Sequence, residues 1–197
     1  MIGILAGSSR MNSNTAKVGK AIKRIAMDLG APENEILMPD FTHFDIPFSN
    51  RGDIQKENFT DFQRAVYDSM AKSKIVFILT PEYNWFPSAE IINLINQFGS
   101  KHFKECWEGK LFATCGISSG RGGRIPAVQI TYVINKLINV MDLHSIVSPK
   151  VFESQFTPQV LDIDGNSIGN VEYDAGLEKF VSYNLGLLNK ISAGLNG

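Results

Sequence analysis

The feature that most restricts the fold is the segment of residues 74–79, whose sequence is KIVFIL. A single lysine is followed by five apolar residues, three of them β-branched. Apolar and polar residues do not alternate here, as they would in a strand with one exposed face. Such a run is typical of a strand covered on both faces, as in a parallel sheet packed between helices. Including this segment, we predict strands at Met1–Ala6, Glu35–Met38, Lys74–Leu79, Leu111–Ile117 and Ser145–Phe152.

Segments with helical periodicity separate the predicted strands. Behind the first strand, Val18, Ile22 and Leu29 recur at the spacing that puts apolar side chains on one helix face. Similar patterns predict helices within 18–29, 62–70, 91–98, 130–141 and 177–191, whereas the polar segment 39–53 has no clear pattern. Strands alternating with helices imply right-handed crossovers, and therefore an α/β fold with a parallel sheet between helical layers. The length of 197 residues fits one domain, which we place at residues 1–197.

Composition excludes several classes of partner. Nineteen basic and twenty acidic residues leave a net charge of -1. No electrostatic surplus is therefore available for a nucleic-acid backbone or an anionic membrane, and we expect neither as a partner. The apolar run at residues 1–6 has no basic segment before it and is too short for a signal peptide, so we interpret it as a strand. Two cysteines without a disulfide pattern are typical of a reducing compartment, and we predict a cytoplasmic protein.

The cysteines and histidines show no pattern typical of a metal site. Cys106 and Cys115 have no second pair, which fits neither a disulfide framework nor a zinc site, and we interpret them as buried, inert thiols. His43, His102 and His144 lack the spacing of metal ligands, so we interpret them as structural or surface groups and expect no metal.

The loop of residues 7–15 (GSSRMNSNT) follows the first strand directly. It offers hydroxyls, amides and the guanidinium of Arg10, and the next helix is expected to begin near Ser13 or Asn14. Free N–H groups and the positive end of that helix dipole point into the loop, an arrangement that suits a phosphate. The alternative is an ordinary polar loop in which Ser13 or Asn14 only caps the helix. The absence of a GK[ST] ending and of GxGxxG disfavours a kinase or an NAD-bound dehydrogenase.

Two further loops follow the third and fourth predicted strands. Residues 80–86 (TPEYNWF) combine polar groups able to bond the edge of a heteroaromatic ring with aromatic groups able to flank its face. In the alternative interpretation, Trp85 and Phe86 pack against a helix or a subunit interface. Residues 116–124 (GISSGRGGR) are rich in glycine, so their backbone can approach a flat ligand closely. Because ligands of such sheets bind beyond the carboxyl ends of the strands, the three loops together indicate a flavin mononucleotide site.

These motifs resemble those of the NADPH-dependent FMN reductases, a family of flavodoxin-like proteins that includes quinone, chromate and azo-dye reductases. GSSRMNSNT is similar to the family's GSxRxxSxN loop, and PEYN, followed nine residues later by Asn93, is similar to its PEYNGSxPGxLKNxID segment. The likeness spans Ile2 to about Pro149. It implies a flavodoxin-like three-layer sandwich, in which a five-stranded parallel sheet of order 2-1-3-4-5 carries helices on both faces.

The resemblance also implies a cofactor, a reaction and a site. The cofactor is FMN, which NADPH or NADH reduces by transferring a hydride. A small electron acceptor (a quinone, free flavin, azo compound or metal oxyanion) then takes the hydride in a ping-pong cycle. The chemistry takes place on FMN, and no catalytic side chain of the protein is expected. The FMN phosphate is expected to be held by Ser8, Arg10, Ser13, Asn14 and Thr15. The ring is expected between Pro81, Glu82, Tyr83 and Asn84 on one side and Ser118, Ser119, Gly120, Gly122 and Gly123 on the other. A homodimer or homotetramer is also expected.

The sequence departs from the family at Trp85 and Phe86, where the family has a small Gly-Ser pair. With Arg121 these residues are expected at the substrate mouth, where the two rings could stack on the flavin, narrow the mouth or block a nicotinamide. Two other functions remain open. One is a flavodoxin-like electron carrier, which near-neutrality and Arg10 disfavour, and the other is a non-redox binding protein whose aromatic residues fill the cofactor space.

Overall fold

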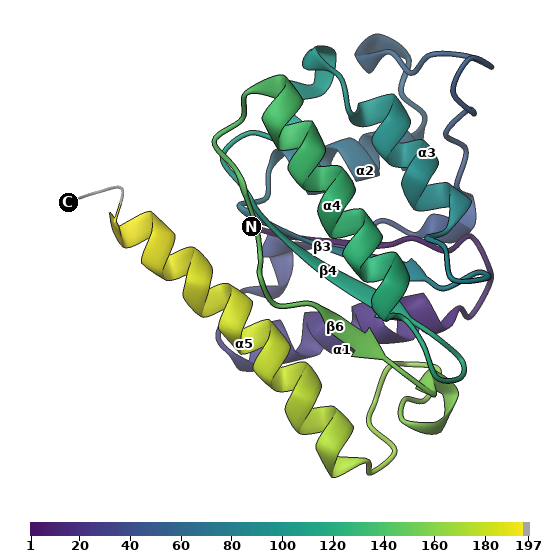
Figure 1. Ribbon diagram of the computed structural model, residues 1–197, viewed down its shortest axis with the longest axis vertical. Helices are drawn as coiled ribbons and strands as arrows, with labels where there is room; N and C mark the ends of the chain where they lie inside the picture. The colour runs from purple at the N-terminus through teal and green to yellow at the C-terminus, as the bar shows by residue number, and fades with distance from the viewer. Residues whose placement is uncertain (195–197) are drawn as a thin grey trace.

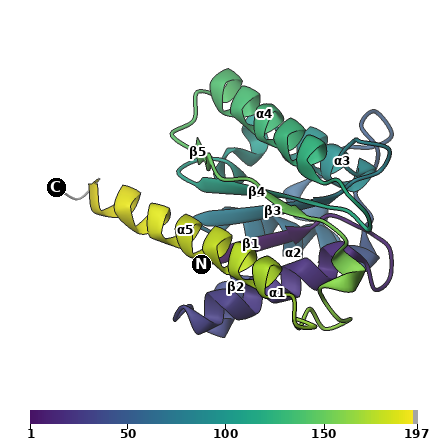
Figure 2. The same ribbon diagram turned by 60° about the horizontal axis from the view of Figure 1, so that its bottom comes forward.

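Figure 1 shows a parallel sheet among the helices, with its strands β3 and β4 labelled. The strands follow the order β2-β1-β3-β4-β5, which can be followed in Figure 2. The computed structural model describes residues 1–194, so the last three residues of the predicted domain lie outside the described part. The strands are β1 Ile2–Ala6, β2 Ile36–Leu37, β3 Ile75–Pro81, β4 Leu111–Ile117, β5 Ile146–Val147 and β6 Phe152–Ser154. The pairings among these strands are parallel, and β6 lies off the main path beside β4. The predicted flavodoxin-like order is confirmed.

The two strands β3 and β4 form the centre of the sheet. Every residue of both strands is buried, and they pair over their full length from Ile75–Leu111 to Pro81–Ile117. Burial on both faces explains why these segments are continuously apolar rather than alternating. Each fully buried aliphatic or aromatic side chain stabilises the fold by about 1.5–3 kcal/mol. The strands β3 and β4 are therefore a stable support for the loops that follow their carboxyl ends.

Helices cover both faces of the sheet (Figure 2). The helices α1 Asn14–Asp28 and α5 Val171–Gly194 lie on one face, where Val18 and Leu177 belong to one hydrophobic cluster. On the other face, α2 Asp61–Ala71, α3 Ala89–Phe98 and α4 Arg124–Met141 contribute to a second cluster. The result is the predicted α/β sandwich of three layers.

The predicted strand Ser145–Phe152 is wrong in its extent. The chain forms two short strands there, β5 beside Leu111 and Phe112 and β6 beside residues 115–117 of β4. Pro149 lies between them and has no N–H to donate, which explains the interruption of the ladder. The displacement brings β6 to the carboxyl end of β4, next to the glycine-rich loop.

The segment after β2 is a long loop with two short 3-10 helices, Phe41–His43 and Lys56–Asn58. Asn93 on α3 holds its middle part. The side-chain amide donates to the carbonyls of Ile46 (3.0 Å) and Pro47 (2.9 Å), and its oxygen accepts from the N–H of Ser49 at 3.2 Å. Asn93, which belongs to the family-like motif, is therefore a structural residue that fixes this loop on α3.

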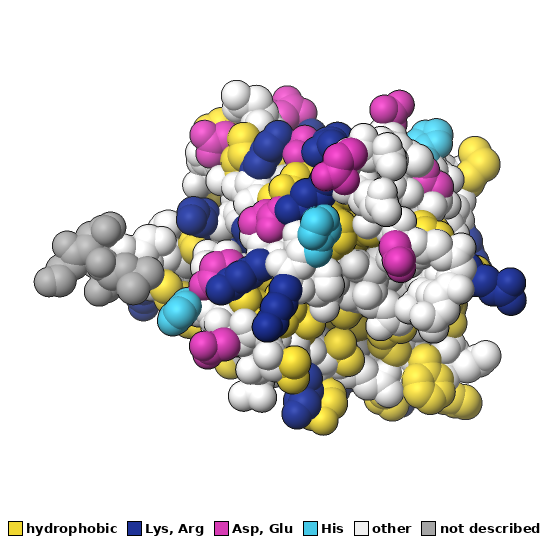
Figure 3. Space-filling view, turned by 90° about the horizontal axis from the view of Figure 1, so that it is seen from above, with side chains coloured by type: hydrophobic (Ala, Val, Ile, Leu, Met, Phe, Trp, Pro, Cys, Tyr) yellow, Lys and Arg dark blue, Asp and Glu magenta, His cyan; other side chains and the backbone are white. Residues whose placement is uncertain are grey.

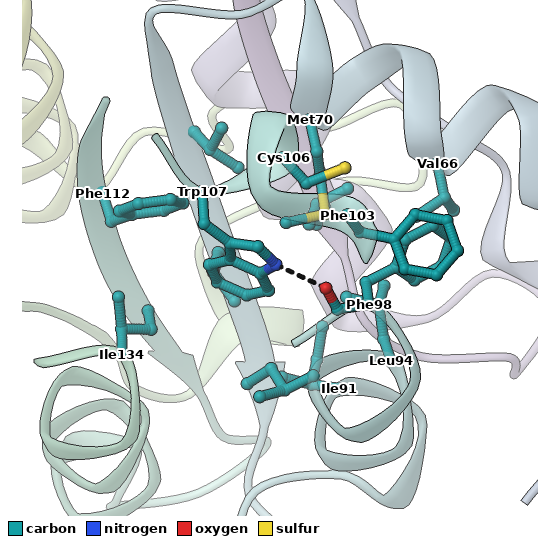
Figure 4. Packing of buried hydrophobic residues seen from close by; sticks show 14 of the residues in the cluster. Val66, Met70, Ile91, Leu94, Phe98, Phe103, Cys106, Trp107, Phe112 and Ile134 are labelled. Atoms are coloured by element: carbon teal, nitrogen blue, oxygen red, sulfur yellow. Dashed lines mark hydrogen bonds between the residues drawn. The ribbon is translucent and has the colours of Figure 1, made fainter. Parts of the chain in front are cut away.

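Trp107 is fully buried in the second cluster, to which α2, α3 and α4 contribute (Figure 4). Its indole N–H donates to the carbonyl of Phe98 at 2.8 Å, at the end of α3. Phe112 on β4 packs against the indole with ring centroids 5.4 Å apart. The indole therefore fixes the end of α3 against the sheet.

The two cysteines are free and buried, as predicted. Burial raises the pKa of Cys106 to about 12 and also raises that of Cys115, so both remain thiols at neutral pH.

The described surface carries charges of both signs. Basic and acidic side chains are interspersed on the face in Figure 3. His43, His102 and His144 are exposed, which fits the second alternative of their interpretation as structural or surface groups. None of the helices within residues 1–194 has the length and apolar character needed to cross a bilayer.

Candidate cofactor site

The loops after β1, β3 and β4 meet at the carboxyl edge of the sheet and surround a cavity of about 290 Å³. Its lining contains these predicted site residues: Ser8, Arg10, Ser13, Asn14, Thr15, Pro81, Glu82, Tyr83 and Ser119. It also contains Met11, Asn12 and Ile117, which the sequence analysis did not select. The predicted residues Asn84, Ser118, Gly120 and Gly122 belong to the surrounding loops rather than to the lining.

The start of α1 faces this cavity. Ser13 caps the helix, because its hydroxyl accepts a hydrogen bond from the N–H of Ala16 at 3.1 Å. The helix begins at Asn14, as the sequence predicted, and its first N–H groups open into the loop. The Thr15 side chain is 1 % exposed, and its hydroxyl oxygen has no hydrogen-bond partner among the described residues. A buried, unpaired hydroxyl beside a helix N-terminus is suited to an anionic ligand.

Tyr83 links the loop after β3 to the loop after β1. Its hydroxyl is hydrogen-bonded to that of Ser8 at 3.2 Å. The guanidinium carbon of Arg10 lies 4.6 Å from the centroid of the Tyr83 ring. Stacking on the ring holds the guanidinium at the cavity while its N–H groups stay free to donate. Arg10 is therefore the cation in the lining of the cavity.

A second link runs from the first loop to α3. The carboxylate of Glu90 accepts hydrogen bonds from the N–H of Ser9 at 3.0 Å and from its hydroxyl at 2.6 Å. Partial burial acts to raise the pKa of Glu90, but the hydrogen bonds from Ser9 outweigh it and the pKa is lowered. Glu90 is not among the predicted site residues, and its only signal in the sequence is its position two residues after the α3 cap, Ser88.

The glycine-rich loop is held by Glu82. The Glu82 carboxylate accepts a 2.5 Å hydrogen bond from the N–H of Gly123. A Cβ at Gly122 would lie 2.5 Å from this carboxylate, and one at Gly116 would lie 1.7 Å from the Gly123 carbonyl oxygen. These close approaches explain the glycines of the loop, and Gly123 also has a positive φ of 96°.

The segment after β6 supports the other side of that loop. The N–H of Ser118 donates to the Ser154 carbonyl at 2.8 Å, and the N–H of Phe156 donates to the Gly120 carbonyl at 2.9 Å. The hydroxyl of Thr157 donates to the Ser118 carbonyl at 3.0 Å. No local sequence pattern indicates these supports, because they depend on where β6 pairs.

The chain reverses direction in a tight turn at Tyr83–Phe86. Asn84 and Trp85 have positive φ angles of 51° and 67°. The side chains of Trp85 and Phe86 are 66 % and 63 % exposed. They therefore neither pack against a helix of their own chain nor fill the cavity. Arg121, the third residue predicted at the mouth, is exposed in the loop between β4 and α4.

A comparison with known families identifies the chain. Residues 1–156 match the family model of the NADPH-dependent FMN reductases. The chain belongs to this family. It is accordingly an NAD(P)H-dependent oxidoreductase with FMN as its cofactor, and the resemblance inferred from the sequence motifs is confirmed.

Individual relatives of this FMN reductase are distant. A quinone reductase from Pseudomonas putida is 22% identical over 151 residues, which are 77% of this chain and 76% of that protein. FerB, a flavoenzyme NAD(P)H:(acceptor) oxidoreductase from Paracoccus denitrificans, has a similar structure with a TM-score of 0.67 and 20% identity, covering 96% of this chain and 97% of FerB. The Trp repressor binding protein of Bacillus subtilis is similar with a TM-score of 0.52 and 13% identity, covering 94% and 97% of the two chains. At these identities the structural likeness shows the fold alone.

Proposed function

We propose that this FMN reductase binds FMN with its phosphate at the start of α1 and its ring between the loops after β3 and β4. The observation that carries the placement is the hydroxyl of Thr15, buried and unpaired beside free helical N–H groups and the guanidinium of Arg10. A phosphate would satisfy all three groups, since its oxygens accept several hydrogen bonds and carry the complementary charge. Ser8, Ser13 and Asn14 complete this part of the site.

The ring would lie between Pro81–Asn84 on one side and Ser118–Gly123 on the other. The bond from Gly123 to Glu82 and the backbone bonds to Ser154 and Phe156 hold these loops at a set separation. Fixed loops can present N–H groups to the polar edge of a flavin without reorganisation. FMN supplies the capacity to accept a hydride from NAD(P)H and to pass reducing equivalents to a second acceptor. The protein binds and orients the reactants, with no catalytic side chain of its own.

We further propose that the oxidised acceptor is a small molecule, such as a quinone, which uses the same mouth as NAD(P)H in turn and gives ping-pong kinetics. The name of the P. putida relative supports a quinone as one acceptor. A single FMN-binding domain in a homodimer or homotetramer, in the cytoplasm, completes the proposal.

An anaerobic titration of the purified protein tests this function. FMN is added to the apoprotein, and then NADPH or NADH, while the visible flavin absorbance is followed. Direct bleaching by either nucleotide without a partner enzyme is expected, and re-oxidation by an added quinone should follow. A flavin that binds but is not bleached would indicate an electron carrier, and a protein that fails to bind FMN would indicate a non-redox role.

A further inference from the structure

The turn that carries Trp85 is unusual in its backbone. The N–H and carbonyl of Tyr83 exchange hydrogen bonds with those of Phe86 at 3.0 and 3.1 Å, and both residues between them have positive φ. Two-residue turns of this kind favour Asn followed by Gly, because a side chain at the second position is strained. Asn84 satisfies the preference at the first position, whereas Trp85 places the largest side chain where glycine is favoured.

Both ends of the turn are held firmly. Tyr83 is bonded to Ser8, as described above, at one end. At the other end, fully buried Ser88 donates its N–H to the hydroxyl of Thr80 at 3.0 Å and its own hydroxyl to the Gly7 carbonyl at 2.6 Å. The rings of Trp85 and Phe86 therefore extend from a fixed support, so that a ligand that contacts them loses little freedom in ordering the turn.

The position of the turn relates it to the reaction. Pro81, Glu82 and Tyr83 line the cavity, and the turn that exposes Trp85 and Phe86 begins at Tyr83, so the two rings follow the cavity lining directly in the chain. Exposed aromatic rings at the entrance to a cofactor cavity are suited to flat ligands with apolar faces, because offset stacking adds to the burial of area.

We propose that Trp85 and Phe86 form an aromatic platform that binds a planar aromatic electron acceptor, of the quinone class, at the entrance to the FMN site. The proposal rests on the proposed function and names the residues that determine acceptor specificity. The platform positions the acceptor by stacking and takes no part in the transfer itself.

Steady-state kinetics with two acceptors test the platform. Menadione is planar and aromatic, whereas ferricyanide has no aromatic face. Trp85→Gly, which the turn accepts without strain, and Phe86→Ser should each raise the ratio of the menadione KM to the ferricyanide KM by about five- to tenfold. Phe48→Ser removes an aromatic side chain that is equally exposed, at 66 %, in the loop after β2, and should leave that ratio as in the wild type.

A binding measurement supplies a readout independent of turnover. The chain has two tryptophans, exposed Trp85 and fully buried Trp107. Menadione added to the apoprotein without NAD(P)H should quench part of the wild-type emission saturably. In Trp85→Gly, where only Trp107 emits, the saturable part should be lost.

Several results would overturn the platform: an equal change in both KM values, the same change in Phe48→Ser, or quenching that persists in Trp85→Gly. A fall in molecular mass from oligomer to monomer in Trp85→Gly would instead assign the two rings to contact with a second copy. If the wild-type flavin is not bleached by NAD(P)H, the proposed function fails, whereas saturable quenching would still show the aromatic binding site.

Discussion

The carboxylate of Glu82 accepts a 2.5 Å hydrogen bond from the N–H of Gly123. The bond joins the loop after β3 to the loop after β4 across the edge of the sheet. The backbone N–H of Glu82 also donates to the Ile117 carbonyl at 2.8 Å, which extends the pairing of the two strands beyond their ends. The two loops proposed to enclose the flavin ring are therefore one connected unit.

Replacing Glu82 tests whether that unit matters for the cofactor. A hydrogen bond to a charged group contributes about 1.5–3 kcal/mol, so Glu82→Ala should weaken FMN binding roughly ten- to hundredfold. Glu82→Gln keeps an acceptor oxygen and should recover part of the loss. Glu153→Ala is a matched control, because the Glu153 carboxylate accepts a hydrogen bond of 2.6 Å from the exposed guanidinium of Arg124. FMN titrations followed by flavin fluorescence give the affinities, and an equal loss in the control would contradict the assignment.

Thr15→Val should move stability and cofactor affinity in opposite directions. Its buried hydroxyl has no partner among residues 1–194, so the isosteric methyl group should stabilise the apoprotein by about 1 kcal/mol. The same change removes a donor to the proposed phosphate and should weaken FMN binding by about tenfold. Thermal unfolding of the apoprotein and FMN titration measure the two effects. Thr15→Ser keeps the hydroxyl and serves as control, and an unchanged affinity in Thr15→Val would remove Thr15 from the phosphate site.

Arg10→Ala should weaken FMN binding more than any other single loss of positive charge. A charge-assisted hydrogen bond of about 1.5–3 kcal/mol disappears, which corresponds to roughly a ten- to hundredfold change. Arg10→Lys should recover only part of the affinity, because an ammonium group lacks the planar fork that pairs with two oxygens. Arg51→Ala makes the same change in net charge at an exposed position in the loop after β2. Isothermal titration calorimetry at two salt concentrations distinguishes a local contact with Arg10 from general electrostatic attraction. Equal losses of FMN affinity in Arg10→Ala and Arg51→Ala would indicate general attraction.

Lys110 should make the stability of the protein depend on pH in the alkaline range. The side chain is buried and donates to the carbonyls of Ser73 at 2.7 Å and Ala71 at 3.2 Å, at the end of α2. Burial lowers the pKa of Lys110 to about 8, whereas the unfolded chain keeps this amine protonated up to about pH 10.4. Between these values the unfolded state binds more protons, so folding becomes more favourable as the pH rises from about 8 to about 10.4 and less favourable as it falls back toward 8. Below that range both states are protonated and Lys110 adds no further pH dependence.

Urea unfolding at about pH 8 and about pH 10 gives the change in unfolding free energy between the two pH values. This change should be more positive in the wild type than in Lys110→Met by about 1–3 kcal/mol. The comparison with Lys110→Met cancels the titration of tyrosines and other lysines. Parallel changes in the two proteins would mean that Lys110 is protonated alike in the folded and unfolded states.

The predicted site residues illustrate what local patterns can identify. Ser13 and the start of α1 followed from the loop motif, because capping depends on residues only a few positions apart. Glu90, Phe156 and Thr157 were missed, because their contacts with the site loops join segments far apart in the chain. No periodicity or spacing within one segment contains that information.

The sequence by itself determined the order of strands and helices, the buried character of β3 and β4, and the polar loop at the start of α1. These follow from hydrophobic periodicity and from capping, which act over a few residues. Only the tertiary structure decided that the Glu82 carboxylate accepts a hydrogen bond from Gly123, that Arg10 lies over the Tyr83 ring, and that Trp85 is exposed. The reason is that the register of the parallel strands places the three loops together, and register depends on the packing of the whole sheet.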